Sequence, residues 1–289
     1  MDKAFILGNP RSGTSLLRIM LNSHPDIVAP PECGFLQWWY SKYKSWNENS
    51  IEKKEFDCFL IDLMSSRKFE TWNIQKKELK EYLKKKHPKS YLQLTECIYR
   101  FWGEKHGKVP KLIIDKNNYY IHHLALIYEA WPDSKFILLV RDGRDVACSY
   151  KEVNKLDTDS PYKPDLPNKI DIIAKEWVEN NDKVIKFFKS IPSSKSHIIR
   201  YEDVILKTEE SLKNLTTFLE LNYDSAMLSY YKKNQKHEIE PAKTLDWKRK
   251  TLNEPDISNI SKYINKLSTE EIKYFELIAS DYLEIFGYE

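Results

Sequence analysis

Long apolar runs, cysteine pairs and a strong charge excess are all missing from this 289-residue chain. No apolar stretch approaches the roughly 20 residues that a membrane-spanning helix needs, so we expect no membrane span. The four cysteines have neither C-x-x-C nor metal-ligand spacing, which favours free thiols. The net charge of only +3 gives no reason to expect nucleic acid as a partner. No signal-peptide pattern is present, so we expect a cytoplasmic protein.

The composition is that of a globular protein, with 41% hydrophobic and 31% charged residues. A chain of this length forms one large domain or two small ones and can bury a substantial core. We find no internal repeat and no low-complexity linker that would divide it. Residues 1–289 are therefore expected to form a single domain.

The first informative pattern lies near the N-terminus, where an apolar run from Ala4 to Leu7 is followed by Gly8 and Gly13. The run is typical of a buried strand, and the apolar-periodic segment after Ser15 predicts a helix. A strand, a glycine turn and a helix N-terminus bind anions in many proteins. The free N–H groups and the positive end of the helix dipole face the anion in that arrangement.

The spacing from Gly8 to Gly13 matches the G-x-x-x-x-G of a nucleotide P-loop, but Thr14 stands where the P-loop lysine would be. Ser15 holds the position of the magnesium-binding hydroxyl, and the positive charge lies inside the loop at Arg11. The loop is therefore predicted to bind a phosphate-like group without the lysine on which nucleotide triphosphate hydrolysis relies. An ordinary glycine turn before a helix is the alternative for so short a motif.

Apolar runs alternate with helical patterns along the rest of the chain. Further strands are expected at 112–115, 136–140 and 197–201, and helices at 121–130, from 146 onward, and at 172–188, 208–220 and 269–285. This alternation predicts an α/β, P-loop-type three-layer fold with a central parallel sheet flanked by helices. Ligands bind at the carboxyl ends of the strands in such sheets, where the loop 8–15, Lys116, Arg141 and Tyr201 would gather.

Three other segments carry weaker patterns. Residues from about 38 to 105 are helical and lysine-rich, and we expect a helical insertion that covers the active site. The aromatic residues between 35 and 46 are expected to line an acceptor pocket there. Segment 154–168 contains three prolines and is expected to be a mobile loop, and 223–260 is expected to be polar and irregular.

The glycine loop resembles the 5′-phosphosulfate loop of the sulfotransferases in residues 10–17, PRSGTSLL. The continuation over 18–26 is similar to the branch that contains the tyrosylprotein and carbohydrate sulfotransferases. That family uses 3′-phosphoadenosine 5′-phosphosulfate (PAPS) as its donor. The resemblance implies that Arg11 and the loop residues Ser12, Gly13, Thr14 and Ser15 bind the 5′-phosphosulfate. It recurs in blocks as far as about residue 255, but not between about 38 and 105.

Later blocks of the resemblance imply roles for five more residues. Arg141 at a strand end and Ser149, eight residues later, match the 3′-phosphate site of the family. Lys116 matches a catalytic lysine that contacts the oxygen between phosphate and sulfate, where it would stabilise the leaving group. Tyr201 matches a tyrosine near the adenine, and Lys250 matches a late loop that closes over the nucleotide.

The general base is a separate question. Cytosolic small-molecule sulfotransferases carry a histidine two residues after the catalytic lysine, and here that position is Asn118. Tyrosylprotein relatives use a glutamate at about the position of Glu32. A part-buried carboxylate can have its pKa raised enough to accept a hydroxyl proton near neutral pH. His122 and His123 are rival bases, although their position in an expected helix favours ordinary packing.

Together, the patterns and the resemblance predict a PAPS-dependent sulfotransferase. Glu32 would deprotonate an acceptor hydroxyl, and Arg11 and Lys116 would stabilise the leaving phosphate during in-line transfer. No metal is expected, because a sulfuryl group carries less charge than a phosphoryl group. The acceptor stays open between a small molecule, a sugar, a peptide tyrosine and a carrier-tethered substrate. A P-loop small-molecule kinase and a non-catalytic nucleotide-binding homologue are the alternatives.

Overall fold

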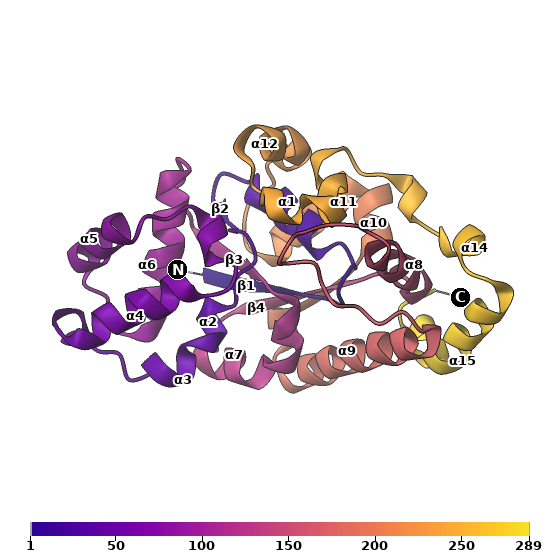
Figure 1. Cartoon of the computed structure of the whole chain (residues 1–289), viewed down its shortest axis with the longest axis horizontal. Coiled ribbons are helices and arrows are strands. Elements are labelled where there is room, and N and C mark those ends of the chain that lie inside the picture. The colour runs from indigo at the N-terminus through magenta and orange to yellow at the C-terminus, as the bar shows by residue number, and fades with distance from the viewer. Residues whose placement is uncertain (1, 289) are drawn as a thin grey trace.

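The computed structural model describes residues 2–288 and shows parallel strands between two layers of helices (Figure 1). In this part of the chain, one sheet of five strands has the order β2-β3-β1-β4-β5, and each neighbouring pair is parallel. The strands are β1 (Asp2–Leu7), β2 (Ile27–Val28), β3 (Leu112–Lys116), β4 (Lys135–Val140) and β5 (Ser196–Arg200). The predicted α/β fold with a central parallel sheet is confirmed. The two-residue strand β2 was not predicted, because it is too short for a pattern.

The helices surround this sheet. They are α1 (Thr14–Asn22), α2 (Phe35–Trp38), α3 (Tyr40–Tyr43), α4 (Lys54–Ser65), α5 (Lys76–Lys86), α6 (Tyr91–Lys105), α7 (Leu124–Ala130), α8 (Gly143–Asn154), α9 (Ile170–Ser190), α10 (Tyr201–Leu206), α11 (Thr208–Phe218), α12 (Tyr230–His237), α13 (Leu245–Lys248), α14 (Tyr263–Lys266) and α15 (Thr269–Ile285). The predicted helices at 172–188, 208–220 and 269–285 correspond to α9, α11 and α15. Among residues 2–288, no helix is both long and apolar enough to cross a bilayer.

The two faces of the sheet belong to two separate hydrophobic clusters. Phe5 and Leu7 of β1 lie in one cluster, with residues of α7, α9 and α15, and Figure 1 shows these helices together below the sheet. Ala4 and Ile6 lie in the other cluster, with residues of α1, α10 and α11. Successive side chains of a strand point to opposite faces. A strand covered on both faces is therefore apolar throughout, as the run in β1 is.

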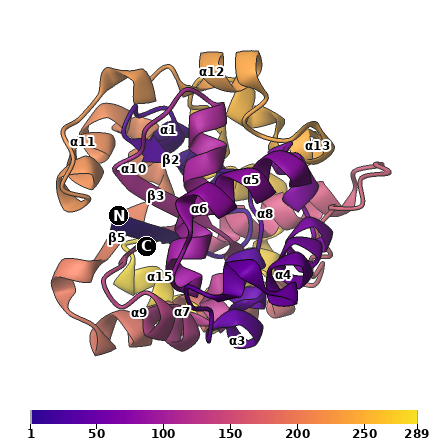
Figure 2. The ribbon, with the colours of Figure 1, turned by 90° about the vertical axis from the view of Figure 1, so that its left-hand side faces the viewer.

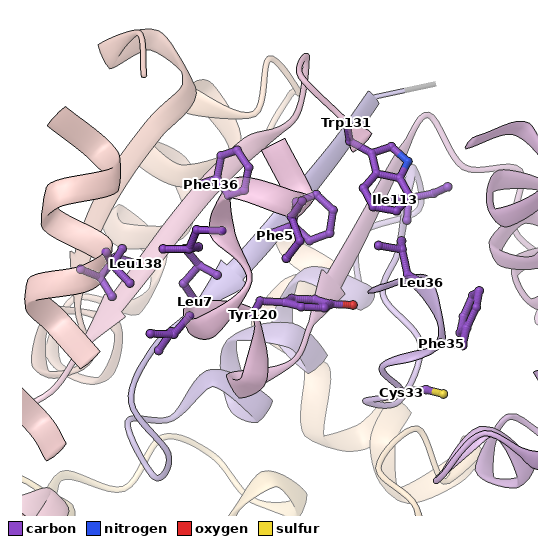
Figure 3. Close-up of a cluster of buried hydrophobic side chains, with 14 of the residues drawn as sticks. Phe5, Leu7, Cys33, Phe35, Leu36, Ile113, Tyr120, Trp131, Phe136 and Leu138 are labelled. Carbon is purple, nitrogen blue, oxygen red and sulfur yellow. The ribbon is translucent and has the colours of Figure 1, made fainter. Parts of the chain in front are cut away.

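Aromatic rings pack against one another in the first cluster, beneath the sheet. Figure 3 shows Phe5 of β1 between Phe136 of β4 and Tyr120, which follows β3. The centroid of the Phe5 ring lies 5.5 Å from each of these two rings, stacked on Phe136 and edge-on to Tyr120. These contacts fix β1, β4 and the segment after β3 relative to one another.

The insertion forms its own helical layer beside the β2–β3 edge of the sheet. Its helices α3 to α6 lie together in Figure 1, and in Figure 2 they face the viewer. A buried carboxylate, Asp115 of β3, joins this layer to the sheet by accepting hydrogen bonds from Tyr99 of α6 and from Tyr120. Burial raises the pKa of Asp115 to about 6.

Three predicted boundaries differ from the structure. Tyr201 begins α10 instead of ending the fourth predicted strand, since β5 stops at Arg200. The helix expected at 121–130 is divided into a 3-10 turn, Asn118–His122, and α7. The segment 223–260 was expected to be irregular, but it contains α12.

The packing of α15 predicts a large effect for one core substitution. Phe275 of α15 is fully buried against Trp177 of α9 and directly over Gly143, where a Cβ atom would come within 2.4 Å of the phenyl ring. We expect Phe275→Ala to lower the free energy of unfolding by about 3–5 kcal/mol, measured by urea denaturation. Leu277→Ala on the same helix, at a side chain that is 79% exposed, should cost less than about 0.5 kcal/mol. Equal losses would show that this contact does not anchor α15.

Candidate functional site

A cavity of about 600 Å³ opens at the carboxyl ends of the central strands. Its lining includes most of the residues that the sequence analysis selected: Arg11, Gly13, Thr14, Ser15, Glu32, Lys116, Arg141, Ser149, Tyr201 and Lys250. Ser12 does not line it. Its hydroxyl is buried and has no hydrogen-bond partner among the described residues. The fold thus brings residues from six separate segments into one concave site.

The glycine loop between β1 and α1 has a shape that only glycine allows. Gly13 has a φ of 94°, and a Cβ atom there would lie 2.5 Å from the ring of Tyr201. This glycine is also the N-cap of α1, and no side chain caps that helix end. The first N–H groups of α1 are therefore available to an anion beside the aromatic ring.

Two arginines lie side by side at the other end of this loop. Arg11 donates from Nε to Ser149 Oγ at 3.1 Å and from Nη2 to the carbonyl oxygen of Trp247 at 2.7 Å. Arg141 donates to the carbonyl oxygens of Arg11 and Asn259, and its buried Nε has no partner. Burial and the charge of Arg141 lower the pKa of Arg11 to about 10.

These arginines make one end of the cavity strongly cationic. Within residues 2–288, neither guanidinium has a carboxylate ion-pair partner. Adjacent guanidinium groups without carboxylates suit a multiply charged anion, which can accept several charge-assisted hydrogen bonds. In this structure Arg11 contacts Ser149, so its side chain connects the two predicted phosphate sites.

Glu32 lies near the opposite end, between two lysines. It forms an ion pair with Lys116 at the end of β3 and another with Lys68, 2.9 Å away, which the insertion supplies. Burial raises the pKa of Glu32, but the charges of Lys116, Lys68 and Lys248 outweigh burial and hold it well below its usual value. The prediction that this pKa is raised is therefore wrong for this structure, because the sequence showed no lysine beside Glu32.

Lys116 is a buried cation whose charge is balanced by this carboxylate. Its side chain is only 2% exposed. Burial lowers the pKa of Lys116, and the neighbouring Glu32 opposes that shift. An anion that offered a better partner than Glu32 would find this ammonium already positioned at the strand end.

A second buried carboxylate holds the C-terminal wall of the cavity. Glu240 accepts hydrogen bonds from Arg18 of α1, from Lys248 of α13, both at 2.6 Å, and from Thr244 at 2.7 Å. Burial raises the pKa of Glu240, but Lys248 and Arg18 outweigh it and lower that pKa to about 2. This network fixes α13, and with it the carbonyl oxygen that Arg11 contacts, against the helix of the glycine loop.

The proline-containing segment lies over the cavity and joins the insertion to the C-terminal wall. The ring of Tyr162 lies 5.7 Å from the guanidinium of Arg67 and 5.8 Å from Nζ of Lys68, and its hydroxyl donates to Glu70. On the other side, Thr158 donates to the carboxylate of Asp246. The expected mobility of this loop stays a prediction.

Two other expectations concern residues outside the cavity. None of the residues 35–46 is among the described residues that line this cavity, so the expected aromatic acceptor pocket stays a prediction. Phe35, Tyr43 and Trp46 instead pack into the core of the insertion. His122 is exposed, 3.5 Å from Lys183, and neither it nor His123 lines the cavity.

Sequence reasoning missed several residues that line the site, among them Lys68, Tyr162, Lys248 and Lys262. The chain contains 46 lysines and arginines, so single lysines carry no signal by themselves. Lys248 had a usable signal, since it stands two residues before the selected Lys250.

Comparisons with known proteins define the family. The sequence model of the "Sulfotransferase family" matches residues 3–225. A putative protein-tyrosine sulfotransferase of Caenorhabditis briggsae is 26% identical, over 99% of this chain and 88% of the relative. Protein-tyrosine sulfotransferase 1 of Danio rerio is 25% identical, over 80% of this chain and 56% of the relative. The chain belongs to the sulfotransferase family, and the prediction of a PAPS-dependent sulfotransferase is confirmed at that level.

Solved structures share the fold. The sulfotransferase domain of the curacin biosynthetic pathway has a TM-score of 0.60 at 22% identity, covering 100% of this chain and 98% of that one. Mouse sulfotransferase SULT7A1, complexed with PAP, has a TM-score of 0.52 at 17% identity, covering 98% and 84%. At these identities the likeness supports the fold alone. The chain spans about half the length of several curated relatives it matches, 52% to 56%.

The Glu240 network predicts a specific pH dependence of stability. The pKa of Glu240 is about 2 in the folded protein, against 4.5 for an ordinary glutamate. The ionised carboxylate therefore stabilises the folded protein fully above pH 4.5, and this stabilisation is lost as the pH falls toward 2. Between pH 7 and pH 3.5 that loss is about 1 kcal/mol. Glu240→Gln should abolish this pH-dependent loss. It should also lower the free energy of unfolding by about 3–5 kcal/mol at pH 7, because Arg18 stays buried without a carboxylate.

Urea denaturation at the two pH values checks this prediction. The matched control is Glu210→Gln, at an exposed position of α11, which should leave both the stability and its pH dependence unchanged. Identical pH dependence in wild type and Glu240→Gln would contradict the assignment.

Proposed function

We propose that this protein transfers the sulfuryl group of PAPS to an acceptor hydroxyl. One observation carries the proposal: an uncapped helix N-terminus and two arginines without carboxylate partners share one cavity. PAPS carries anionic groups at both its 5′ and 3′ ends, so it suits a site with two cationic regions. The PAP in the mouse relative is the nucleotide that remains when PAPS has given up its sulfuryl group, and this supports the same choice.

The donor would lie along the cavity from α1 to α8. The amides of residues 12–15 hold the 5′-phosphosulfate, and Arg141 and Ser149 hold the 3′-phosphate. Tyr201 lies beside the glycine loop, where it bounds the nucleotide, and Lys250 lines the outer wall. Arg11 lies between the two phosphate sites and can turn from Ser149 toward the 5′ group.

Donor binding would prepare the base. Lys116 moves its hydrogen bond from Glu32 to the oxygen between phosphate and sulfate, where it stabilises the charge that develops on the leaving group. Glu32 then keeps Lys68 as its partner and has one carboxylate oxygen free for the acceptor hydroxyl. Losing one adjacent cation raises the pKa of Glu32 toward the range in which it accepts a proton during transfer.

The acceptor is a hydroxyl compound that enters beside Glu32 and Tyr162. The curated relatives are named protein-tyrosine sulfotransferases, which favours a phenol such as a peptide tyrosine as the first class to test. Transfer without a metal ion is part of the proposal, and unchanged turnover in EDTA is its check. A small-molecule kinase is the second candidate, and Thr14 at the P-loop lysine position disfavours it.

The donor is tested by calorimetry with adenosine 3′,5′-bisphosphate (PAP) and, separately, with ADP and magnesium. We expect PAP to bind, ADP with magnesium to give little heat, and Arg141→Ala to weaken PAP binding by at least about tenfold. Arg100→Ala on α6, outside the cavity lining, is the control and should bind as wild type. Binding of ADP with magnesium and indifference to the 3′-phosphate would overturn the proposal in favour of the kinase.

Catalysis is tested through PAP release from PAPS in the presence of a tyrosine-containing peptide and a simple phenol. We expect Glu32→Gln to lower the transfer rate by roughly 10²–10⁴-fold, because the hydroxyl loses its base. PAP affinity should change little. Lys116→Met should also lose transfer, whereas the exposed Lys111→Met just before β3 should not. Wild-type activity in both cavity variants would identify a binding protein or a different catalytic group.

A further inference from the structure

Two lysines from different parts of the chain hold Glu32, the proposed base. Lys116 at the end of β3 donates to Oε2 of the carboxylate, and Lys68 of the insertion donates to Oε1 at 2.9 Å. During transfer the proposed function assigns Lys116 to the donor and leaves Lys68 where it is. Lys68 is then the remaining ion-pair partner of the base, so its geometry decides where the carboxylate lies.

The backbone of Lys68 has a conformation that is unusual for a residue with a side chain. Its φ is 72°, in the left-handed region, which costs free energy and persists only where the surrounding structure enforces it. The carbonyl oxygen of Lys68 accepts hydrogen bonds from the N–H of Thr71 at 3.0 Å and from its hydroxyl at 2.6 Å. Phe69 and Trp72, in the 3-10 turn that follows, are both buried. The local fold therefore directs this lysine, independently of its ion pair.

The same turn is bonded to the segment that carries the base. The thiol of Cys33, directly after the base, donates to the carbonyl oxygen of Arg67 at 3.5 Å. On the other side, Nε1 of Trp72 donates to the carbonyl oxygen of Pro31 at 2.8 Å. These two contacts enclose the base in one strand of chain and Lys68 in the other, so the backbones of the two residues are fixed to each other.

Charged groups from the sheet, the insertion and the C-terminal wall face the base. Burial raises the pKa of the base, and the charges of Lys116, Lys68 and Lys248 lower it, in that order. Asp115 of β3 is a neighbouring carboxylate: burial raises its pKa, and the charge of the base adds to that rise. Lys248 already pairs with Glu240, whereas among residues 2–288 Lys68 has no carboxylate partner besides the base. Lys68 thus supplies the main unshared positive charge at the base once Lys116 has turned to the donor.

We propose that Lys68 is a positioning residue for sulfuryl transfer, which holds the carboxylate of Glu32 by Oε1 and so presents Oε2 to the acceptor hydroxyl. This inference rests on the proposed function. During transfer the hydroxyl oxygen forms a bond to sulfur as the bond from sulfur to the leaving phosphate oxygen breaks, and the hydroxyl proton passes to Glu32. Lys68 keeps its own proton throughout and touches neither the donor nor the acceptor.

The pH dependence of the transfer rate tests this role. Lys68→Met keeps the length of the side chain and removes its charge, so Glu32 should bind its proton more tightly. We expect the acid limb of the kcat profile, measured with PAPS and a phenol, to move up by about one to two pH units. Below that limb the rate should fall about tenfold for each pH unit of the displacement, and above it the rate should approach that of wild type. Lys68→Arg should keep the wild-type limb.

Two controls show whether Lys68 acts through the base. Lys77→Met, at an exposed lysine of α5 in the same insertion, should leave the profile unchanged. In the Glu32→Gln background, Lys68→Met should change the residual rate by less than about twofold, because the carboxylate on which it acts is absent. An equal fall in both backgrounds would mean that Lys68 contacts the donor or the acceptor directly, and the inference would be wrong.

A titration of Glu32 itself gives a readout that does not depend on turnover. NMR of the glutamate carboxyl carbons with PAP bound, in which the Glu32 signal is assigned by its loss in Glu32→Gln, should give a midpoint about one to two pH units higher in Lys68→Met than in wild type. An unchanged midpoint with an unmoved acid limb would overturn the positioning role and leave the proposed function standing. A rate that is lower at every pH with an unmoved limb would also overturn it, since Lys68 would then only support the fold. If wild type transfers no sulfuryl group from PAPS, the proposed function fails and the positioning role fails with it.

Discussion

Repulsion between like charges is the constraint on which this structure depends. Its cavity gathers positive side chains from the glycine loop, from two strand ends and from the C-terminal segment. Three carboxylates from different parts of the chain pair with four of its lysines. Glu32 pairs with Lys116 and Lys68, Glu240 with Arg18 and Lys248, and Glu152 with Lys262.

The three carboxylates differ in how firmly they are held. Glu240 is buried and accepts hydrogen bonds from three side chains, so its role is structural. Glu32 and Glu152 line the cavity itself and pair with lysines. Arg11 and Arg141 have no carboxylate ion-pair partner among residues 2–288, which leaves excess positive charge where two phosphate groups are proposed to bind. The arrangement favours an anion with several charged groups over a singly charged one.

The sequence predicted those elements that show a pattern over several residues or a contiguous motif. The apolar runs of β1, β3 and β4 are covered on both faces, so their position was clear, and the glycine loop is a contiguous pattern that places Gly13 and Ser15. Lys116 and Arg141 follow from the rule that ligands bind at strand ends. By contrast, Lys68 and Lys262 reach the cavity through tertiary packing. Their neighbours in the sequence carry no periodic or motif signal, and for the same reason the pKa of Glu32 was predicted with the wrong sign.

The insertion carries aromatic rings that belong to the same hydrophobic cluster as the lower face of the sheet, and among them Phe35 and Trp72 pack with Tyr99. Among the described residues between 38 and 105, Lys68 alone lines the cavity. Substitutions elsewhere in this layer therefore replace no side chain that lines the cavity. The sequence of this layer can therefore diverge faster than the lining of the cavity.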